Sequence, residues 1–188
     1  MQKNNLKRKY RVGICGHRDL FSLEINEYKK KIIDIFGKLI NTYPNNEIFV
    51  VTSLAEGADR LIVECAISLG LRYEVVLPMD ATLYKKDFDE ISKKEFNNFF
   101  LSAAGSFTMP FVEDNTFEQI MQQGEQRDRQ YQFAGKEVVG RSNHMIFLYD
   151  GVDNSFIGGT ADIFQYANHI NKSYDVIKCK RESKGEIT

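Results

Sequence analysis

Short apolar runs rich in β-branched residues alternate with longer segments of helical periodicity along most of the 188-residue chain. Most of the runs are apolar almost throughout, which is typical of strands buried on both faces of a parallel sheet. Alternation of this kind predicts right-handed βαβ crossovers and a doubly wound, Rossmann-like α/β sheet with helices on both faces. The predicted strands cover residues 10–15, 48–53, 73–77, 106–109, 144–149 and 174–179.

Apolar residues between the runs recur at three- and four-residue steps, which predicts amphipathic helices. Ser22 is expected to cap the first helix, which Pro44 ends, and Gly70 is expected just after the second. Residues 79–104 predict a loop followed by a helix, whereas residues 111–124 have no clear period and predict a long loop. The last two helices are expected at about residues 125–141 and 160–171.

The length suits a single domain spanning residues 1–188, with a core at about residues 10–179 and a polar tail at each end. The net charge of −1 gives no argument for a nucleic-acid or membrane partner. No apolar stretch approaches the roughly 20 residues that span a bilayer, and the chain does not begin with a signal-peptide pattern. We therefore expect a cytoplasmic protein.

The three cysteines, Cys15, Cys65 and Cys179, lie far apart in apolar surroundings. Their odd number and their spacing predict buried, reduced thiols, in keeping with a cytoplasmic protein. The histidines show no ligand spacing with any cysteine, so we expect no metal site and no bound cofactor.

In an open parallel sheet, ligands bind outside the carboxyl ends of the strands, so the residues that follow each run are the candidate site. Gly16, His17, Arg18 and Asp19 follow the first run. Gly16 permits a tight turn or a close ligand approach, His17 could donate to a ligand, and Arg18 could hold a phosphate or a carboxylate. The alternative is that Arg18 pairs with Asp19 at the surface while His17 only packs.

The second run leads through Ser53 into a predicted helix start around Gly57, where free N–H groups form an anion site. Glu56 and Asp59 flank this helix start. Either carboxylate could accept from a ligand, Glu56 from a ribose hydroxyl, or both could only satisfy the helix dipole. Arg60 could face the ligand or point away from it.

Tyr84 and Asp87 follow the third run and could stack on a base and bind its edge. The equally valid alternative is that Tyr84 belongs to the core. Asp150 follows the fifth run, ahead of the segment Gly158–Gly159–Thr160 at the start of the last helix. Paired glycines and a threonine at a helix start are typical of a phosphate-binding loop, although a plain helix start with Thr160 as its N-cap has the same residues.

Several of these motifs together resemble one known group of proteins. The segments VGICGHRD, TSLAEGADRLIVECAISLG, VVLPM and GGTAD are similar to those of the SLOG superfamily, and the likeness extends over residues 12–176. SLAEGADR together with GGTAD resembles one bacterial branch, which includes ligand-sensing domains of antiphage systems. The resemblance implies a Rossmann-like fold that binds nucleotides or nucleotide-derived signals such as ADP-ribose derivatives.

One departure separates this chain from the Lonely Guy enzymes of the superfamily. Their pattern, PGGxGTxxE, ends in a catalytic glutamate three residues after the threonine, where this chain has Ile163. The glycines carry over, but the glycosidase assignment does not. If the chain is an enzyme that cleaves an N-glycosidic bond, another carboxylate must serve. The candidates are Glu56 and Asp150, followed by Asp87 and Glu125.

The principal hypothesis is therefore a module that binds a nucleotide-like molecule, and the alternative is a nucleotide hydrolase or N-glycosidase. A binding module would act through a homo-oligomer or a separate effector protein, because the sequence shows no output domain. Arg18, Ser53 and the glycine segment would hold phosphate, while Glu56, Tyr84 and Asp150 would hold ribose or base. The ligand-binding candidates are Gly16, His17, Arg18, Ser53, Glu56, Gly57, Asp59, Arg60, Tyr84, Asp87, Asp150, Gly158, Gly159 and Thr160.

Overall fold

In the computed structural model, which describes residues 7–113, 115–153 and 156–182, six strands form one sheet. All neighbouring strands run parallel, in the order β4-β3-β2-β1-β5-β6. The predicted α/β fold with a parallel sheet is confirmed. The strands are β1 (Arg8–Gly16), β2 (Asn46–Thr52), β3 (Arg72–Leu77), β4 (Gly105–Thr108), β5 (His144–Tyr149) and β6 (Ser173–Lys178).

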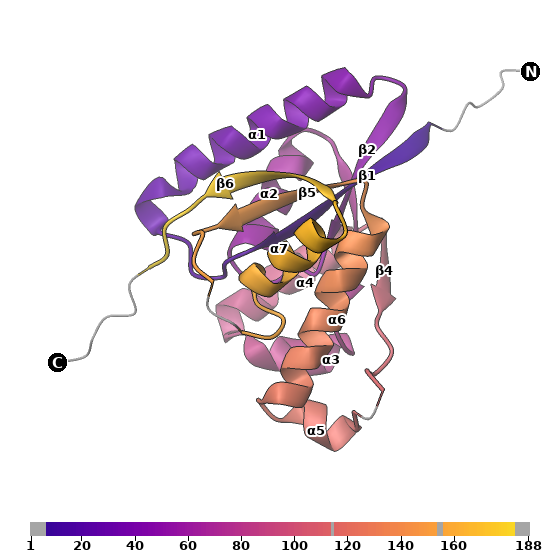
Figure 1. Ribbon diagram of the computed structural model, residues 1–188, viewed down its shortest axis with the longest axis vertical. Helices are drawn as coiled ribbons and strands as arrows, with labels where there is room; N and C mark the ends of the chain where they lie inside the picture. The colour runs from indigo at the N-terminus through magenta and orange to yellow at the C-terminus, as the bar shows by residue number, and fades with distance from the viewer. Residues whose placement is uncertain (1–6, 114, 154–155, 183–188) are drawn as a thin grey trace, which may run out of the picture.

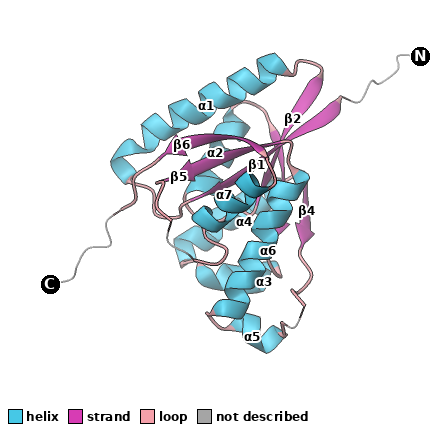
Figure 2. Ribbon diagram, in the orientation of Figure 1, coloured by secondary structure: helices cyan, strands magenta, loops and turns pink. Residues whose placement is uncertain are grey.

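Helices cover both faces of the sheet, as Figures 1 and 2 show. The larger core cluster joins one face to α1 (Ile25–Thr42), α2 (Ala58–Ser68) and α4 (Glu90–Ser102). The smaller cluster joins the other face to α6 (Glu125–Arg141) and α7 (Thr160–His169). The short elements are α3 (Ala81–Tyr84), α5 (Phe117–Met121) and the 3-10 turns η1 (Ser22–Glu24) and η2 (Lys85–Asp87).

Burial differs between the centre and the edges of the sheet. Every residue of β5 is buried, whereas every residue of β4 is exposed and β6 buries only Ile177. β4 and β6 are the two edge strands, so each has a neighbouring strand on one side only. The expectation of strands buried on both faces therefore holds for the centre of the sheet and is wrong at its edges.

Two local predictions are wrong. Ser22 does not cap the first helix, because it begins the turn η1 and its backbone N–H donates to the Glu182 carboxylate at 2.7 Å. The stretch predicted as a long loop contains α5, which a reciprocal pair of hydrogen bonds between Thr116 and Gln119 caps at its start. A helix of five residues is too short to show a period, so only its capping residues could have indicated it.

The strand order determines where a crevice for a ligand opens at the edge of the sheet. β1 lies at the centre, and the chain leaves it toward β2 through α1 but returns to its other side only at β5. The segments that follow β1 and β5 therefore lead to opposite faces of the sheet. A crevice opens between such segments at the carboxyl ends of the two strands, and ligands of doubly wound sheets bind there.

Candidate functional site

A cavity of about 420 Å³ lies at the carboxyl ends of the strands, where the segments that follow β1 and β5 lead to opposite faces of the sheet. Its walls come from the segments after β1, β2 and β3, from one face of α6 and from the start of α7. Ile14, Val138 and Ile163 form an apolar part of the wall. Of the predicted ligand-binding residues, those that line the cavity are Gly16, His17, Arg18, Ser53, Asp59, Tyr84, Gly158, Gly159 and Thr160.

Arg18 contributes a free positive charge to this cavity. Its side chain forms no hydrogen bond and no ion pair with any residue that the structure describes, and its guanidinium lies 5.7 Å from the centre of the Tyr131 ring. Asp19 pairs with Arg181 instead, so the alternative of an Arg18–Asp19 surface pair is not realised. A guanidinium is always charged at neutral pH and binds phosphate or carboxylate well.

The start of α7 presents polar groups to the same cavity. Gly159 caps the ten-residue helix without a side-chain bond, so Thr160 is its first residue and not its cap. The Thr160 hydroxyl and the N–H groups of Thr160 and Ala161 have no hydrogen-bond acceptor among the described residues. Free donors at a helix start favour an anion.

Gly158 has a packing role beside its place in the cavity wall. Its φ is +73°, and a Cβ atom here would lie 2.7 Å from the Asp128 carbonyl oxygen and 2.8 Å from the Gln132 nitrogen of α6. Its own N–H donates to Asp162 at 2.7 Å. Gly158 therefore lets this segment approach α6, and the donors left for a ligand are those that follow it.

Asp59 is a buried carboxylate in the wall formed by the segment after β2. Its Oδ2 accepts from the Thr52 hydroxyl at 3.0 Å and from the backbone N–H groups of Ser53 at 3.2 Å and Ala55 at 3.3 Å. Burial raises the pKa of Asp59 to about 6, although these hydrogen bonds act in the opposite direction. Its second oxygen, Oδ1, accepts no hydrogen bond from the described residues.

Gly57 joins the segments after β1 and β2. Its φ is +72°, and a Cβ atom there would lie 2.2 Å from the Arg18 carbonyl oxygen. The next residue, Ala58, donates its N–H to the His17 carbonyl oxygen at 3.0 Å. The glycine is therefore needed for the close approach that holds the backbone of Arg18 at the cavity.

His17 is buried beside Asp150, which follows β5. The His17 Nε2 and Asp150 Oδ1 atoms lie 3.0 Å apart, but not in the alignment of a regular hydrogen bond. Burial lowers the pKa of His17, so the imidazole is neutral at pH 7. Burial also opposes the charge of Asp150, but the hydrogen bond from the Val152 N–H and the close contact with His17 outweigh it and lower the pKa of that carboxyl.

Five predicted residues do not line the cavity: Glu56, Gly57, Arg60, Asp87 and Asp150. Arg60 is 3% exposed and binds the Leu54 carbonyl oxygen, Ser92 and Glu95, so it links α2 to α4. Glu56 accepts from the Ser92 hydroxyl in the same cluster. Asp87 forms a buried ion pair with Arg127 at 2.9 Å and accepts from the Tyr131 hydroxyl.

The sequence patterns missed several residues that line the cavity. Tyr131 lies within the periodic pattern of α6, and helical periodicity indicates burial and not a ligand. Arg181 lies in the polar tail, where no local pattern could identify it. Cys15 is only half-buried at the cavity, unlike Cys65 and Cys179. The described residues contain no cluster of His, Cys, Asp or Glu suited to a metal ion, and none of their helices could cross a membrane.

Comparisons with known proteins bear on the fold. No protein-family model and no curated protein matches the chain. The X-ray structure of DNA processing protein A (DprA) from Streptococcus pneumoniae is similar, with a TM-score of 0.57 and 15% sequence identity over 97% of this chain. The match covers 52% of that chain, so this protein spans about half of its length. At this identity the likeness shows a shared fold and no more, so the SLOG superfamily and its bacterial branch stay predictions.

Proposed function

We propose that this protein binds a nucleoside phosphate in the cavity at the carboxyl ends of β1 and β5. The observation that carries the proposal is the unpaired guanidinium of Arg18, which shares the cavity with the free hydroxyl and N–H groups at the start of α7. A cation without a partner and a helix start without an acceptor both favour an anionic ligand.

The rest of the cavity suits the uncharged parts of such a ligand. Tyr131 is only partly buried and offers aromatic surface to a base, and Ile14 and Val138 form an apolar wall beside it. Tyr84 is 1% exposed and belongs to the core, in keeping with the alternative interpretation of that residue. The free oxygen of Asp59 can accept a hydrogen bond from the ligand. A volume of about 420 Å³ lies within the range of small-molecule sites, which combine an apolar lining with a few polar groups.

Asp59 also favours a second candidate function, the cleavage of an N-glycosidic bond. It is a carboxyl in the cavity wall whose pKa is raised to about 6 by burial, and a pKa near neutrality suits a general acid or base. The sequence candidates are less suited to this role, because Glu56 is bound to Ser92 and Asp150 lies beside His17. Asp59 is therefore the residue to test for hydrolysis.

The test combines binding and product analysis. The protein is mixed with AMP, GMP, CMP, UMP, NAD and cyclic ADP-ribose, while calorimetry measures affinity and chromatography detects released base. A single-stranded oligonucleotide is included because the structural neighbour is named for DNA processing. Binding with intact ligand supports the module, and base release that Asp59→Asn abolishes supports the hydrolase. If only the oligonucleotide binds, or nothing does, the proposal is wrong.

Variants locate the site. Arg18→Gln removes a charged hydrogen-bond donor and is expected to weaken binding of the tightest ligand about tenfold. Thr160→Val removes the hydroxyl without changing the shape and should have a smaller effect in the same direction. Arg129→Gln is the matched control, because Arg129 is an exposed arginine on the outside of α6 that pairs with Glu125. Equal affinities of wild type and Arg18→Gln would exclude this site.

Cytoplasmic location and an oligomer or effector as partner stay predictions.

A further inference from the structure

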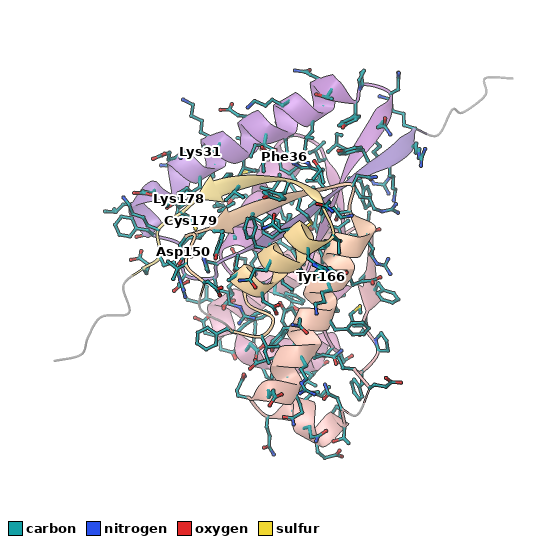
Figure 3. The ribbon with its side chains drawn as sticks, viewed as in Figure 1. Lys31, Phe36, Asp150, Tyr166, Lys178 and Cys179 are labelled. Atoms are coloured by element: carbon teal, nitrogen blue, oxygen red, sulfur yellow. The ribbon has the colours of Figure 1, made fainter. Side chains whose placement is uncertain are left out.

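Residues 179–182, the described part of the segment that follows β6, contribute to the cavity wall and are not a free tail. They run antiparallel to the segment after β1, where Leu20 and Arg181 form a bridge. The Phe21 N–H donates to the Lys180 carbonyl oxygen, and the Glu182 N–H donates to the Asp19 carbonyl oxygen, each at 2.9 Å. Figure 3 shows Cys179 next to Asp150, in agreement with the bond from the Cys179 N–H to the end of β5. Backbone bonds therefore anchor this segment.

Arg181 uses one edge of its guanidinium to hold the carboxylate of Asp19. Its Nε donates to Asp19 Oδ1 at 2.9 Å and its Nη2 to Asp19 Oδ2 at 3.0 Å. Both residues line the cavity. Backbone hydrogen bonds already anchor the segment, and a partly exposed ion pair adds little stability. The main effect of the bidentate pair is therefore to orient the carboxylate of Asp19.

Asp19 keeps acceptor capacity on the side away from Arg181. A carboxylate has about four lone-pair positions, of which the bidentate arginine uses two. No other side chain and no backbone N–H among the described residues donates to this carboxylate, and the side chain is 29% exposed. Asp19 therefore presents oriented acceptors at the rim of the cavity.

The cavity thus offers donors and acceptors to different parts of a ligand. Arg18 and the start of α7 donate to an anion, whereas Asp19 can only accept. An anionic group near Asp19 would also meet the carboxylate of Asp150, whose Oδ2 lies 3.9 Å from Arg181 Nη1. Neutral hydroxyl groups fit this end better than a second phosphate, and vicinal ribose hydroxyls are bound by an acidic residue in other doubly wound folds.

We propose that Asp19, positioned by Arg181, accepts the ribose hydroxyls of the ligand, so that the cavity selects ribonucleotides over 2′-deoxyribonucleotides. This inference rests on the proposed function and assigns the part of the ligand that the phosphate-binding groups leave free. A site that hydrogen-bonds a substrate hydroxyl discriminates strongly against an analogue without it, because its buried polar groups then lack a partner.

The experiment measures the affinities of AMP, GMP, CMP and UMP and of their 2′-deoxy counterparts by calorimetry. The tightest ribonucleotide is expected to bind at least about tenfold more tightly than its deoxy counterpart. Asp19→Asn should weaken the ribonucleotide about tenfold and leave the deoxyribonucleotide within about twofold, so that the preference disappears. ADP is measured beside AMP, because a second phosphate bound by Arg181 would instead appear as a gain in affinity that Arg181→Gln removes.

Arg181→Gln tests the positioning role. It should reduce the preference for ribose, and Arg181→Lys should restore part of it, because a lysine can still pair with Asp19 but cannot hold both oxygens. Lys180→Gln is the matched control in the same segment, since the Lys180 amine pairs with Glu24 and not with a residue of the cavity wall. Thermal unfolding of each variant shows that it folds.

The outcomes separate the two proposals. Equal affinity of wild type for ribo- and deoxyribonucleotides, or an equal loss of both in Asp19→Asn, overturns the role of Asp19 while nucleotide binding stands. A gain with ADP that depends on Arg181 assigns the arginine to a second anion and also overturns it. Absence of binding by all these nucleotides overturns the proposed function and this inference together.

Discussion

Two arginines near Tyr131 are held in different ways. Arg127 is 1% exposed and donates to Tyr131, to the carboxylate of Asp87 and to the carbonyl oxygens of Leu83 and Ile120. Arg18 lies near the Tyr131 ring and has no side-chain hydrogen bond to a described residue. A guanidinium with all its partners inside the fold stabilises the structure, whereas one left free at a cavity is available to a ligand.

The buried network around Arg127 and the cavity share one residue, Tyr131. The Tyr131 hydroxyl bonds to Asp87 and Arg127, and its ring lines the cavity. The buried network therefore holds the aromatic wall that a ligand would contact. Changes in the network should act on stability, and changes at the cavity should act on affinity.

The largest effect is expected from Arg127→Met. The change leaves the buried carboxylate of Asp87 without its cation, which should lower the free energy of unfolding by about 3–5 kcal/mol. Urea denaturation at pH 7 measures it. Arg129→Met, two residues further along α6 at an exposed ion pair, should cost no more than about 1 kcal/mol. Similar midpoints for the two variants would mean that the buried network does not stabilise the fold.

Asp59 differs from both arginines, because it is a buried charge-bearing group without an ion pair. Its burial predicts that the stability of the protein depends on pH. Burial raises its pKa from 3.8 to about 6, so the folded state binds a proton that the unfolded state has released. The stability that this carboxyl contributes is complete below pH 4 and is lost as the pH rises through about 6, a total of roughly 3 kcal/mol.

The measurement compares wild type with Asp59→Asn by urea denaturation from pH 4.5 to pH 7.5. Asparagine does not ionise, so the stability of the variant should rise relative to wild type across this interval. Burial lowers the pKa of His17, so this residue makes stability rise with pH in both proteins. The difference in stability between wild type and variant therefore isolates the contribution of Asp59. Parallel profiles would show that Asp59 does not titrate in this range.

The smallest change in stability of the three is expected from Arg60→Met. Arg60 donates to the buried Leu54 carbonyl oxygen and to Ser92 of α4, and its loss leaves these acceptors without that donor, at a cost of about 2 kcal/mol. The affinity for the tightest nucleoside monophosphate should stay within about twofold, in contrast to Arg18→Gln. Calorimetry and urea denaturation on the same samples test both statements. A tenfold loss of affinity in Arg60→Met would show that the cluster around Arg60 also affects ligand binding.

Local pattern was sufficient to predict most of the fold and part of the candidate site. The apolar runs predicted all six strands, and the strand-end rule directed attention to Arg18, Asp59 and Thr160, which the structure brings to one cavity. Local pattern did not distinguish an arginine that faces the cavity from one that is paired inside the fold. Arg18, Arg60 and Arg127 look alike in sequence, because each follows or lies within a polar stretch at the carboxyl end of the sheet.

The sequence by itself determined which segments become strands and helices, since burial imposes a period that adjacent residues display. Only the tertiary structure decided which charges meet. Asp19 lies beside Arg18 in the chain, yet its partner is Arg181, 162 residues away. Pairing depends on how distant segments are packed, and no local period encodes it. For the same reason the segment after β6, which resembles a free tail in sequence, forms part of the cavity wall.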